Sequence, residues 1–302
     1  MEKPFILHML TTAKNLSPFD VNMALDAGWV SAIPYINVEP SEVRGLVQDA
    51  IFSRSPKSLK KTGIFIGGRD TKQALDMLKT AKNSMVPPFE VSVFADPSGA
   101  FTTAAGMVAA VEHELQKTFN TTLEGKNVLA LGGTGPVGQA AAVIAAQAGA
   151  NVRIIGRQLD KAERIAELCS NEFGEGTIQI MAGADTDKAE FMKTADVVFA
   201  TGAAGIELLS AELIASAPQL KVAADVNAVP PSGIAGLDAF HNGAPLPGSK
   251  SGAVGIGALA IGNVKYQAQN KLLKIMLDAE KPVYLHFTHA FEVARDFIKT
   301  KA

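Results

Sequence analysis

The chain has 302 residues, of which 47% are hydrophobic and 19% charged, as in a soluble globular protein with room for two domains. Its net charge of −2 provides no broad basic surface for nucleic acid or an anionic membrane, and one cysteine, Cys169, excludes an internal disulfide framework. No Cys/His cluster has zinc spacing, so no metal is expected. The N-terminal apolar run is too short for a secretory signal and no run suits a membrane span, which favours a cytoplasmic protein.

Strand and helix patterns alternate through the first 120 residues. The predicted strands are FILHML, VSAIPYI, TGIFIGG and FEVSVFA. Pro18 suits the first position of the first helix, and Ser17, Ser41 and Asp70 are the expected caps of three successive helices. A longer helical pattern ends near Phe119, before the polar stretch NTTLEGK. Repeated strand–helix units predict a parallel sheet with helices on its faces.

A second alternating series begins at Val128 and contains the predicted strands NVRIIG, TIQIMA, ADVVFATG and LKVAADV. Residues 230–260 are rich in Gly and Pro. A helix over 263–280, a short strand in VYLHF and a final helix over 289–301 close the chain. The expected organisation is an N-terminal α/β substrate domain of residues 1–120, to which 275–302 return, and a second domain of residues 121–274.

A glycine motif marks the second domain as a dinucleotide-binding, Rossmann-type domain with a parallel sheet. The motif G-x-G-x-x-G follows the strand NVLALG and opens a helix, which is the context that this fingerprint requires. Its residues are predicted to bind the cofactor: Gly133, Thr134, Gly135, Pro136, Val137 and Gly138. Glycine permits the tight turn, the approach of the backbone to a pyrophosphate and close helix packing, and the helix N-terminus offers N–H groups to the anion.

The second strand of this domain ends in Gly156-Arg157, where NAD-binding domains usually carry Asp or Glu. The guanidinium of Arg157 suits a 2′-phosphate, no carboxylate is there to repel it, and Lys161 lies one helical turn on. NADP is therefore the predicted cofactor, with NAD still possible. Gly202, the last residue of ADVVFATG, and Asn227, directly after LKVAADV, complete the predicted cofactor-binding residues.

Acid–base constellations are scarce, and none of the five histidines pairs with a serine or cysteine nucleophile, so no hydrolase triad is predicted. Hydride transfer depends more on positioning than on a base when the substrate has no hydroxyl to deprotonate. A carbon between two nitrogens, as in a methylene-pterin, is such a substrate. Phe19 and the ADPSGAFTT segment lie at strand ends where ligands bind in open α/β sheets.

The chain resembles the NAD(P)-dependent methylene-tetrahydromethanopterin dehydrogenases of methylotrophic bacteria nearly from end to end. The resemblance is carried by ILHMLTTAKNLSPFDVNMALDAG, QDAIFSRSP, KTGIFIGG, VPPFEVSVFADPSGAFTTAAGMVAAV, GGTGPVG, ADVNAVPPSGIAGLD and VGIGALAIGNVKYQ. It implies a two-domain α/β protein with the pterin in a cleft between the domains. It also implies oxidation of N5,N10-methylene-tetrahydromethanopterin to the methenyl form with NAD(P)+, in formaldehyde oxidation.

The resemblance assigns roles to individual residues. Lys265 matches the family's active-site lysine, and Phe19 matches an aromatic residue of the pterin site. Further matches to cleft-lining, substrate-binding positions are Asp20, Asp96, Ser98, Thr102 and Thr103. Family members are homo-oligomers, trimers among them, so a homo-oligomer with a trimer favoured is expected.

Alternatives remain at the level of the sequence. Most blocks resemble a branch that uses NAD or NADP and only methanopterin carriers, whereas IIGRQLDKAERIA resembles a branch that uses NADP and also accepts tetrahydrofolate carriers. A methylene-tetrahydrofolate dehydrogenase, with or without cyclohydrolase activity, is the nearest alternative. A non-catalytic NADP-sensing protein is a remote one, and the first-domain blocks do not fit glutamyl-tRNA reductase or shikimate dehydrogenase.

Overall fold

The computed structural model describes residues 3–301, and its contacts divide the chain into two compact units. Unit 1 comprises Met1–Thr102 and Tyr266–Val293, and unit 2 comprises Thr103–Lys265 and Ala294–Ala302. Each of the three crossings between the units falls inside a helix: α5 (Ala100–Phe119), α10 (Ala258–Asp278) and α11 (Phe287–Lys301). The predicted domain boundaries at 120/121 and 274/275 stay a prediction, and residues 1, 2 and 302 of the predicted ranges lie outside the described residues.

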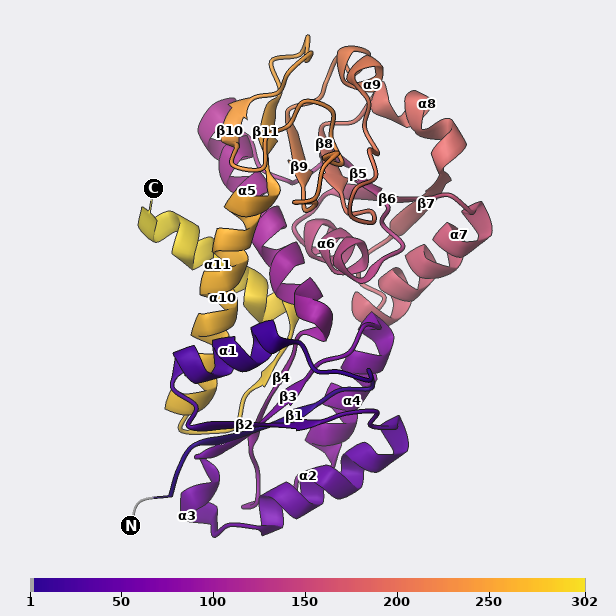
Figure 1. Cartoon of the computed structure of the whole chain (residues 1–302). Helices are drawn as coiled ribbons and strands as arrows, with labels where there is room; N and C mark the ends of the chain where they lie inside the picture. The colour runs from indigo at the N-terminus through magenta and orange to yellow at the C-terminus, as the bar shows by residue number, and fades with distance from the viewer. Residues whose placement is uncertain (1–2, 302) are drawn as a thin grey trace. The chain divides into compact units, whose positions relative to one another are not determined.

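Unit 1 is built on a parallel five-stranded sheet of order β12-β4-β3-β1-β2. Its strands are β1 (Ile6–Leu10), β2 (Ser31–Tyr35), β3 (Thr62–Ile66), β4 (Ser92–Ala95) and β12 (Tyr284–Leu285); its own helices are α1 (Pro18–Ala27), α2 (Val43–Phe52), α3 (Pro56–Leu59) and α4 (Thr71–Asn83). Helices α2 and α4 cover one face of the sheet and α1 lies over the other (Figure 1). Every residue of β3 and β4 is buried, as expected for central parallel strands.

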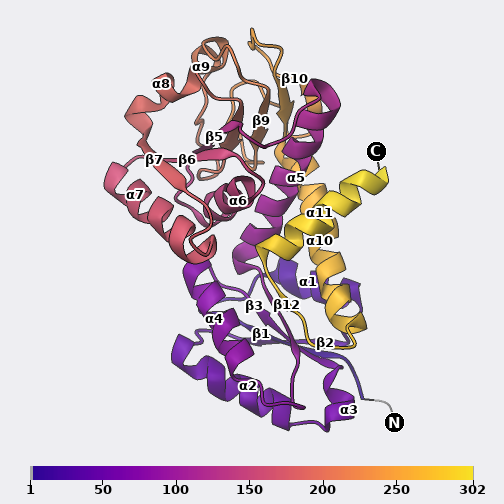
Figure 2. The same cartoon turned by 180° about the vertical axis from the view of Figure 1, so that it is seen from behind.

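Unit 2 holds a seven-stranded sheet of order β10-β11-β9-β8-β5-β6-β7, in which only β10 runs antiparallel to its neighbour. Its strands are β5 (Asn127–Leu131), β6 (Asn151–Gly156), β7 (Ile180–Ala184), β8 (Val197–Ala200), β9 (Val222–Asp225), β10 (Asn242–Pro245) and β11 (Val254–Ile256). The helices are α6 (Pro136–Gln147), α7 (Leu159–Leu168), α8 (Lys188–Met192) and α9 (Ala211–Ala215). Figure 2 shows α6 and α7 together beside β6 and β7, and α8 and α9 grouped separately, so helices cover both faces.

The two-unit α/β fold with parallel sheets confirms the predicted fold class. Every predicted strand is present, usually shorter by one to three residues at its ends. The Gly- and Pro-rich segment 230–260 additionally contains β10 and β11, which no alternating pattern revealed because both are short. Helix α10 starts at Ala258, five residues before the predicted start, and the N–H of Leu259 donates to the carbonyl of Ala239 at 2.8 Å.

The expected helix caps are only partly correct. Asp70 caps α4, since its carboxylate accepts from the N–H of Gln73 at 2.8 Å. Ser17 occupies the N-cap position of α1 but makes no side-chain cap bond. Ser41 is not a cap, because a short 3-10 turn precedes α2 and is closed by Glu39 and Glu42 instead. Within residues 3–301, no helix has the combined length and apolar character to traverse a membrane.

Candidate functional site

The glycine loop of unit 2 joins β5 to α6 at the centre of the seven-stranded sheet. β5 lies between β6 and β8, and the chain continues first to one side and then to the other, so this is the switch point at which α/β sheets bind ligands. A Cβ on Gly138 would lie 2.5 Å from the Cα of Gly133, and a Cβ on Gly133 would lie 2.6 Å from the carbonyl oxygen of Ala130. A Cβ on Gly135 meets no atom nearer than 3.7 Å. Close packing therefore requires glycine at positions 133 and 138. At Gly135 the backbone stays accessible, as the binding of a pyrophosphate requires.

Two further residues support this loop and were not predicted. Gly132 has φ +68°, and a Cβ there would lie 2.6 Å from the Cα of Gly202. The predicted residue Gly202 therefore packs directly against the loop. Gln139 lies in the first turn of α6. Its side-chain amide donates to the carbonyl of Thr134 at 2.8 Å and so stabilises the glycine loop. The doubled glycine in LGGTG was the available signal for Gly132.

A cavity of about 330 Å³ lies beside the glycine loop at the end of β6. Its lining residues are Thr134, Arg157, Gln158 and Lys161. The predicted pair Arg157 and Lys161 thus meets the predicted loop, and the lining contains two cationic side chains and no carboxylate. The nearby Asp160 is paired with Arg164 at 3.6 Å. This donor set fits the 2′-phosphate of NADP, whereas the carboxylate that would accept from a free ribose 2′-OH is missing from it.

Asn227 lies just beyond β9 and organises a loop. Its backbone N–H donates to Asp225 at 2.9 Å, its amide donates to the carbonyl of Pro231 at 2.9 Å, and its side-chain oxygen accepts from the N–H of Val229 at 2.9 Å. Asp225 is buried and also accepts from the N–H of Gly233 at 2.6 Å. Burial raises the pKa of Asp225, and these backbone hydrogen bonds oppose the rise. A cofactor contact of Asn227 stays a prediction.

A second cavity, of about 310 Å³, lies within unit 1. Its lining residues are Thr11, Ala13, Asn15, Leu16, Ser17, Pro18, Asp20, Gly68, Arg69 and Ser98. These residues follow β1, β3 and β4 or begin α1, and β1 is the strand at which the order of this sheet reverses. The cavity thus occupies the corresponding switch point of unit 1. It brings together the predicted residues Asp20 and Ser98 and adds a cationic residue, Arg69.

Asp20 is held by a residue that sequence patterns did not identify. Gln269 of α10 is fully buried, and its amide nitrogen donates to a carboxylate oxygen of Asp20 at 2.8 Å, across 249 residues of sequence. The Asp20 side chain is also buried. The amide oxygen of Gln269 has no partner within residues 3–301. A polar residue one turn after Lys265 on an otherwise apolar helix face was the only signal for Gln269.

The predicted residues after β4 have two different roles: one lines the cavity and others are buried. Asp96 and Thr102 are fully buried and bonded to each other, with a hydroxyl–carboxylate distance of 2.6 Å, and Asp96 also accepts from the N–H of Phe101 at 2.9 Å. Neither residue is part of the cavity lining. Ser98, which is part of it, has φ +52° and donates to the carbonyl of Gly68 at 2.8 Å. The buried pair supports a strained turn that presents Ser98.

Lys265 and Thr103 belong to unit 2 and lie on two helices in close contact. A Cβ on Gly106 of α5 would lie 3.1 Å from the backbone nitrogen of Lys265, so glycine lets the backbones of α5 and α10 approach at this point. Thr103 is one turn before Gly106 on α5 and shares its face.

Phe19, on α1 of unit 1, is 40% exposed, which leaves its ring accessible to a ligand. No group of three or more metal-binding side chains occurs among residues 3–301.

A family model described as the N-terminal part of methylene-tetrahydromethanopterin dehydrogenase matches residues 18–98, the stretch that contains Phe19, Asp20 and Ser98. The NAD(P)-dependent methylenetetrahydromethanopterin dehydrogenase of Methylorubrum extorquens is 47% identical over 292 residues, which cover 96% of this chain and 97% of that protein. The bifunctional protein MdtA of the same organism is 33% identical and covers 92% of this chain and 94% of its own length.

Solved structures resemble the chain in fold alone. The shikimate 5-dehydrogenase of Listeria monocytogenes superposes with a TM-score of 0.56 at 14% identity, and the match covers 96% of each chain. The superposition supports a shared α/β fold, and identity at this level says nothing of substrate.

Proposed function

The chain belongs to the methylene-tetrahydromethanopterin dehydrogenase family, and on this premise we propose that it oxidises the methylene group of a tetrahydromethanopterin-type carrier with NADP+. The observation that carries the cofactor assignment is the cavity of Thr134, Arg157 and Lys161 beside an accessible Gly135. NAD+ is a possible second acceptor, because the glycine loop binds the part that both cofactors share.

In the proposed reaction the bridging carbon of the carrier loses a hydride and becomes a methenyl group. The two adjacent nitrogens share the resulting positive charge, so no proton has to leave. When bound, the nicotinamide ring supplies the hydride acceptor. The chain therefore needs residues that orient the carrier and exclude water rather than a general base.

The carrier is proposed to enter the cavity of unit 1. The Asp20 carboxylate, held by Gln269, is an acceptor for the amino and ring N–H donors of a pterin, and a carboxylate makes such bonds strongly. Ser98 and Arg69 offer further polar contacts from the same cavity, and the accessible ring of Phe19 can pack on a flat heterocycle. Asp96, Thr102 and Thr103 complete the proposed substrate-binding set, the first two by supporting Ser98.

Lys265 is proposed as the catalytic residue, acting by position. A protonated lysine next to a cationic product would destabilise it, so a role in orienting the carrier through polar contact is favoured over proton transfer. The close approach of α5 and α10 at Gly106 supports this, because it holds the backbone of Lys265 in place.

Oligomeric state and location are also proposals. The family resemblance supports a homo-oligomer, with a trimer favoured, which light scattering on the purified chain would measure. The use of NADP and a dissociable carrier supports a site of action in the cytoplasm, in one-carbon and formaldehyde oxidation.

The proposed function is tested by initial rates of NADPH formation with methylene-tetrahydromethanopterin, repeated with methylene-tetrahydrofolate and with NAD+. The proposal expects the methanopterin carrier with NADP+ to give the highest kcat/KM. Turnover of the folate carrier alone would make the chain a methylene-tetrahydrofolate dehydrogenase. Binding of NADPH without turnover of either carrier would favour an NADP-sensing protein.

A further inference from the structure

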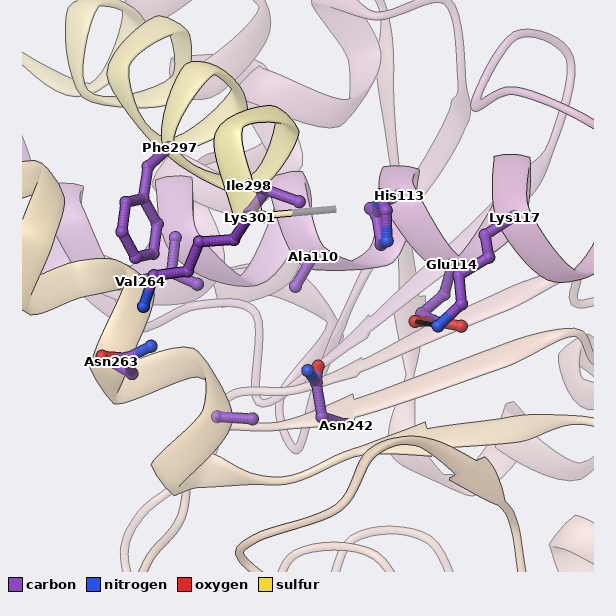
Figure 3. A pocket seen from close by; sticks show the side chains of 11 residues that line it. Ala110, His113, Glu114, Lys117, Asn242, Asn263, Val264, Phe297, Ile298 and Lys301 are labelled. Carbon is purple, nitrogen blue, oxygen red and sulfur yellow. Dashed lines mark hydrogen bonds and ion pairs between the residues drawn. The ribbon is translucent and has the colours of Figure 1, made fainter.

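A third cavity, of about 530 Å³, lies within unit 2 and is larger than both cavities of the proposed reaction. Its walls come from α5, α10, the end of α11 and the first residue of β10 (Figure 3). Its volume is within the range of small-molecule sites. None of the predicted site residues is among those that line it.

This cavity is separate from the NADP cavity. Asn242 lines it at the start of β10, an edge strand, whereas Arg157 follows β6, five strand positions away in the same sheet. At about 4.8 Å per strand, the two strands are about 24 Å apart. Lys265 follows the lining residue Val264 on α10, but successive helical residues point about 100° apart, and Lys265 is not part of the lining.

The charged side chains are unevenly placed in the cavity. At one end Glu114 is almost fully buried, and both of its oxygens are engaged: one with Lys117 at 3.2 Å and the other with the hydroxyl of Thr118 at 3.0 Å. At the other end Lys301 extends from α11 past Phe297 toward α10 (Figure 3), with its ammonium 4.7 Å from the centre of the Phe297 ring. No carboxylate within residues 3–301 forms an ion pair with Lys301.

The remaining lining combines polar donors with an apolar wall. Asn263 lies at the Lys301 end, and His113 and Asn242 lie between the two ends (Figure 3). The apolar part of the lining consists of Ala110, Ala260, Val264, Phe297 and Ile298. A ligand therefore meets one ammonium that pairs with no carboxylate of residues 3–301, together with neutral amides and an extended apolar surface.

We propose that this cavity binds a small organic anion, with its charged group at Lys301 and Asn263 and its apolar body against Val264 and Phe297. A cationic ligand is disfavoured, because the carboxylate of Glu114 is already neutralised and two ammonium groups face the cavity. Carboxylates and phosphate esters share this chemistry. The ligand would contact α5, α10 and α11, the three helices in which the chain passes from one unit to the other.

The test places a cysteine in the cavity wall, as Ala260→Cys, and measures its modification by N-ethylmaleimide. The single native cysteine, Cys169, is buried, and burial raises the pKa of its thiol to about 12, so it does not contribute. Benzoate and benzylammonium, which share a ring and differ in charge, are the probes. We expect benzoate at about 10 mM to slow the modification about threefold, and benzylammonium to have no effect.

Three matched variants complete the experiment. Asn83→Cys, on an exposed position of α4, should be modified at the same rate with and without either probe. Added to Ala260→Cys, Lys301→Gln should abolish protection by benzoate, whereas Lys299→Gln on the same helix should leave it intact. Equal protection by both probes, absence of protection by benzoate, or protection that survives Lys301→Gln would each overturn the proposal. The measurement does not depend on dehydrogenase activity, so its failure would leave the proposed function unaffected.

Discussion

Arg157 and Lys161 are the residues on which cofactor choice depends. They face the glycine loop across a cavity whose lining contains no carboxylate, and the nearest acidic side chain of α7, Asp160, is paired with Arg164. A guanidinium binds a phosphate through two charge-assisted hydrogen bonds. Its hydrogen bond to a neutral ribose hydroxyl is weaker. Recognition of the 2′-phosphate is therefore a property of these side chains rather than of the fold.

Arg157→Ala should raise KM for NADP+ at least about tenfold, because a hydrogen bond to a charged group contributes about 1.5–3 kcal/mol. KM for NAD+ should change little. Initial rates with both cofactors measure the difference, and Arg44→Ala, at an exposed position of α2 in unit 1, serves as the control. Equal changes for the two cofactors would contradict the 2′-phosphate assignment.

Gln269→Met should raise KM for the carrier, because it removes the hydrogen bond from the Gln269 amide to the buried Asp20 carboxylate, and a hydrogen bond to a charged group contributes about 1.5–3 kcal/mol. KM for NADP+ should stay unchanged, which a general loss of structure would not allow. Gln267→Met, two residues earlier on α10, is the matched control. A change in both KM values together, or none, would show that Gln269 does not position Asp20.

Lys265→Ala should lower kcat/KM for the carrier about 100-fold, since misplacing a bound reactant has effects of this size. Lys265→Arg should restore part of the activity if polar contact is the role of this residue. Lys271→Ala, at an exposed position of α10, should behave like the parent enzyme. Near-normal kcat/KM in the alanine variant would remove Lys265 from the site.

At the level of elements, the turn from β5 to α6 separates two uses of glycine. Gly133 and Gly138 pack against each other and against β5, while a Cβ on Gly135 would make only ordinary contacts, the nearest at 3.7 Å. The sequence motif specifies glycine at each of these positions but does not show why glycine is needed there. Only the surrounding backbone distinguishes a glycine kept for packing from one kept for access.

Gly138→Ala should lower the midpoint of thermal unfolding, because its Cβ would lie 2.5 Å from the Cα of Gly133, and backbone cannot yield cheaply. Gly135→Ala should leave that midpoint unchanged and weaken NADPH binding. Unfolding midpoints and the Kd for NADPH, measured on both variants, test the contrast. The assignment fails if Gly135→Ala binds NADPH normally or if Gly138→Ala unfolds at the parent's temperature.

At the scale of the whole molecule, a half-buried pair of histidines links stability to pH. His286 and His289 at the start of α11 have ring centres 4.8 Å apart, and the Nδ1 of His286 has no partner within residues 3–301. Burial, reinforced by the neighbouring His289, lowers the pKa of His286 from its usual 6.5 to about 4. Between these values the unfolded chain takes up a proton that the folded chain does not, so stability falls as pH falls.

The free energy of unfolding in urea should therefore decrease by about 1–3 kcal/mol through this histidine as pH is lowered from about 6.5 to 4. His286→Phe keeps a ring in place and removes the titration, so its unfolding free energy should depend less steeply on pH. Identical pH slopes for the variant and the parent would show that His286 does not contribute.

Strand and helix positions, the glycine loop and the cationic end of β6 were determined by the sequence alone. Each depends on residues close together in the chain: hydrophobic periodicity, turn chemistry and helix starts are local, so local patterns predict them. The short strands β10 and β11 were missed, because three or four residues among glycines and prolines carry no period.

Only the tertiary structure decided which distant residues meet. Gln269 reaches Asp20 across 249 residues, Asp96 and Thr102 turn out to be buried supports, and the cavity at Lys301 forms where parts of three helices converge. Such contacts follow from the packing of whole elements, which a residue's neighbours in the chain do not specify. Sequence therefore determined the chemistry of the cofactor loop, and packing determined how the remaining polar residues are used.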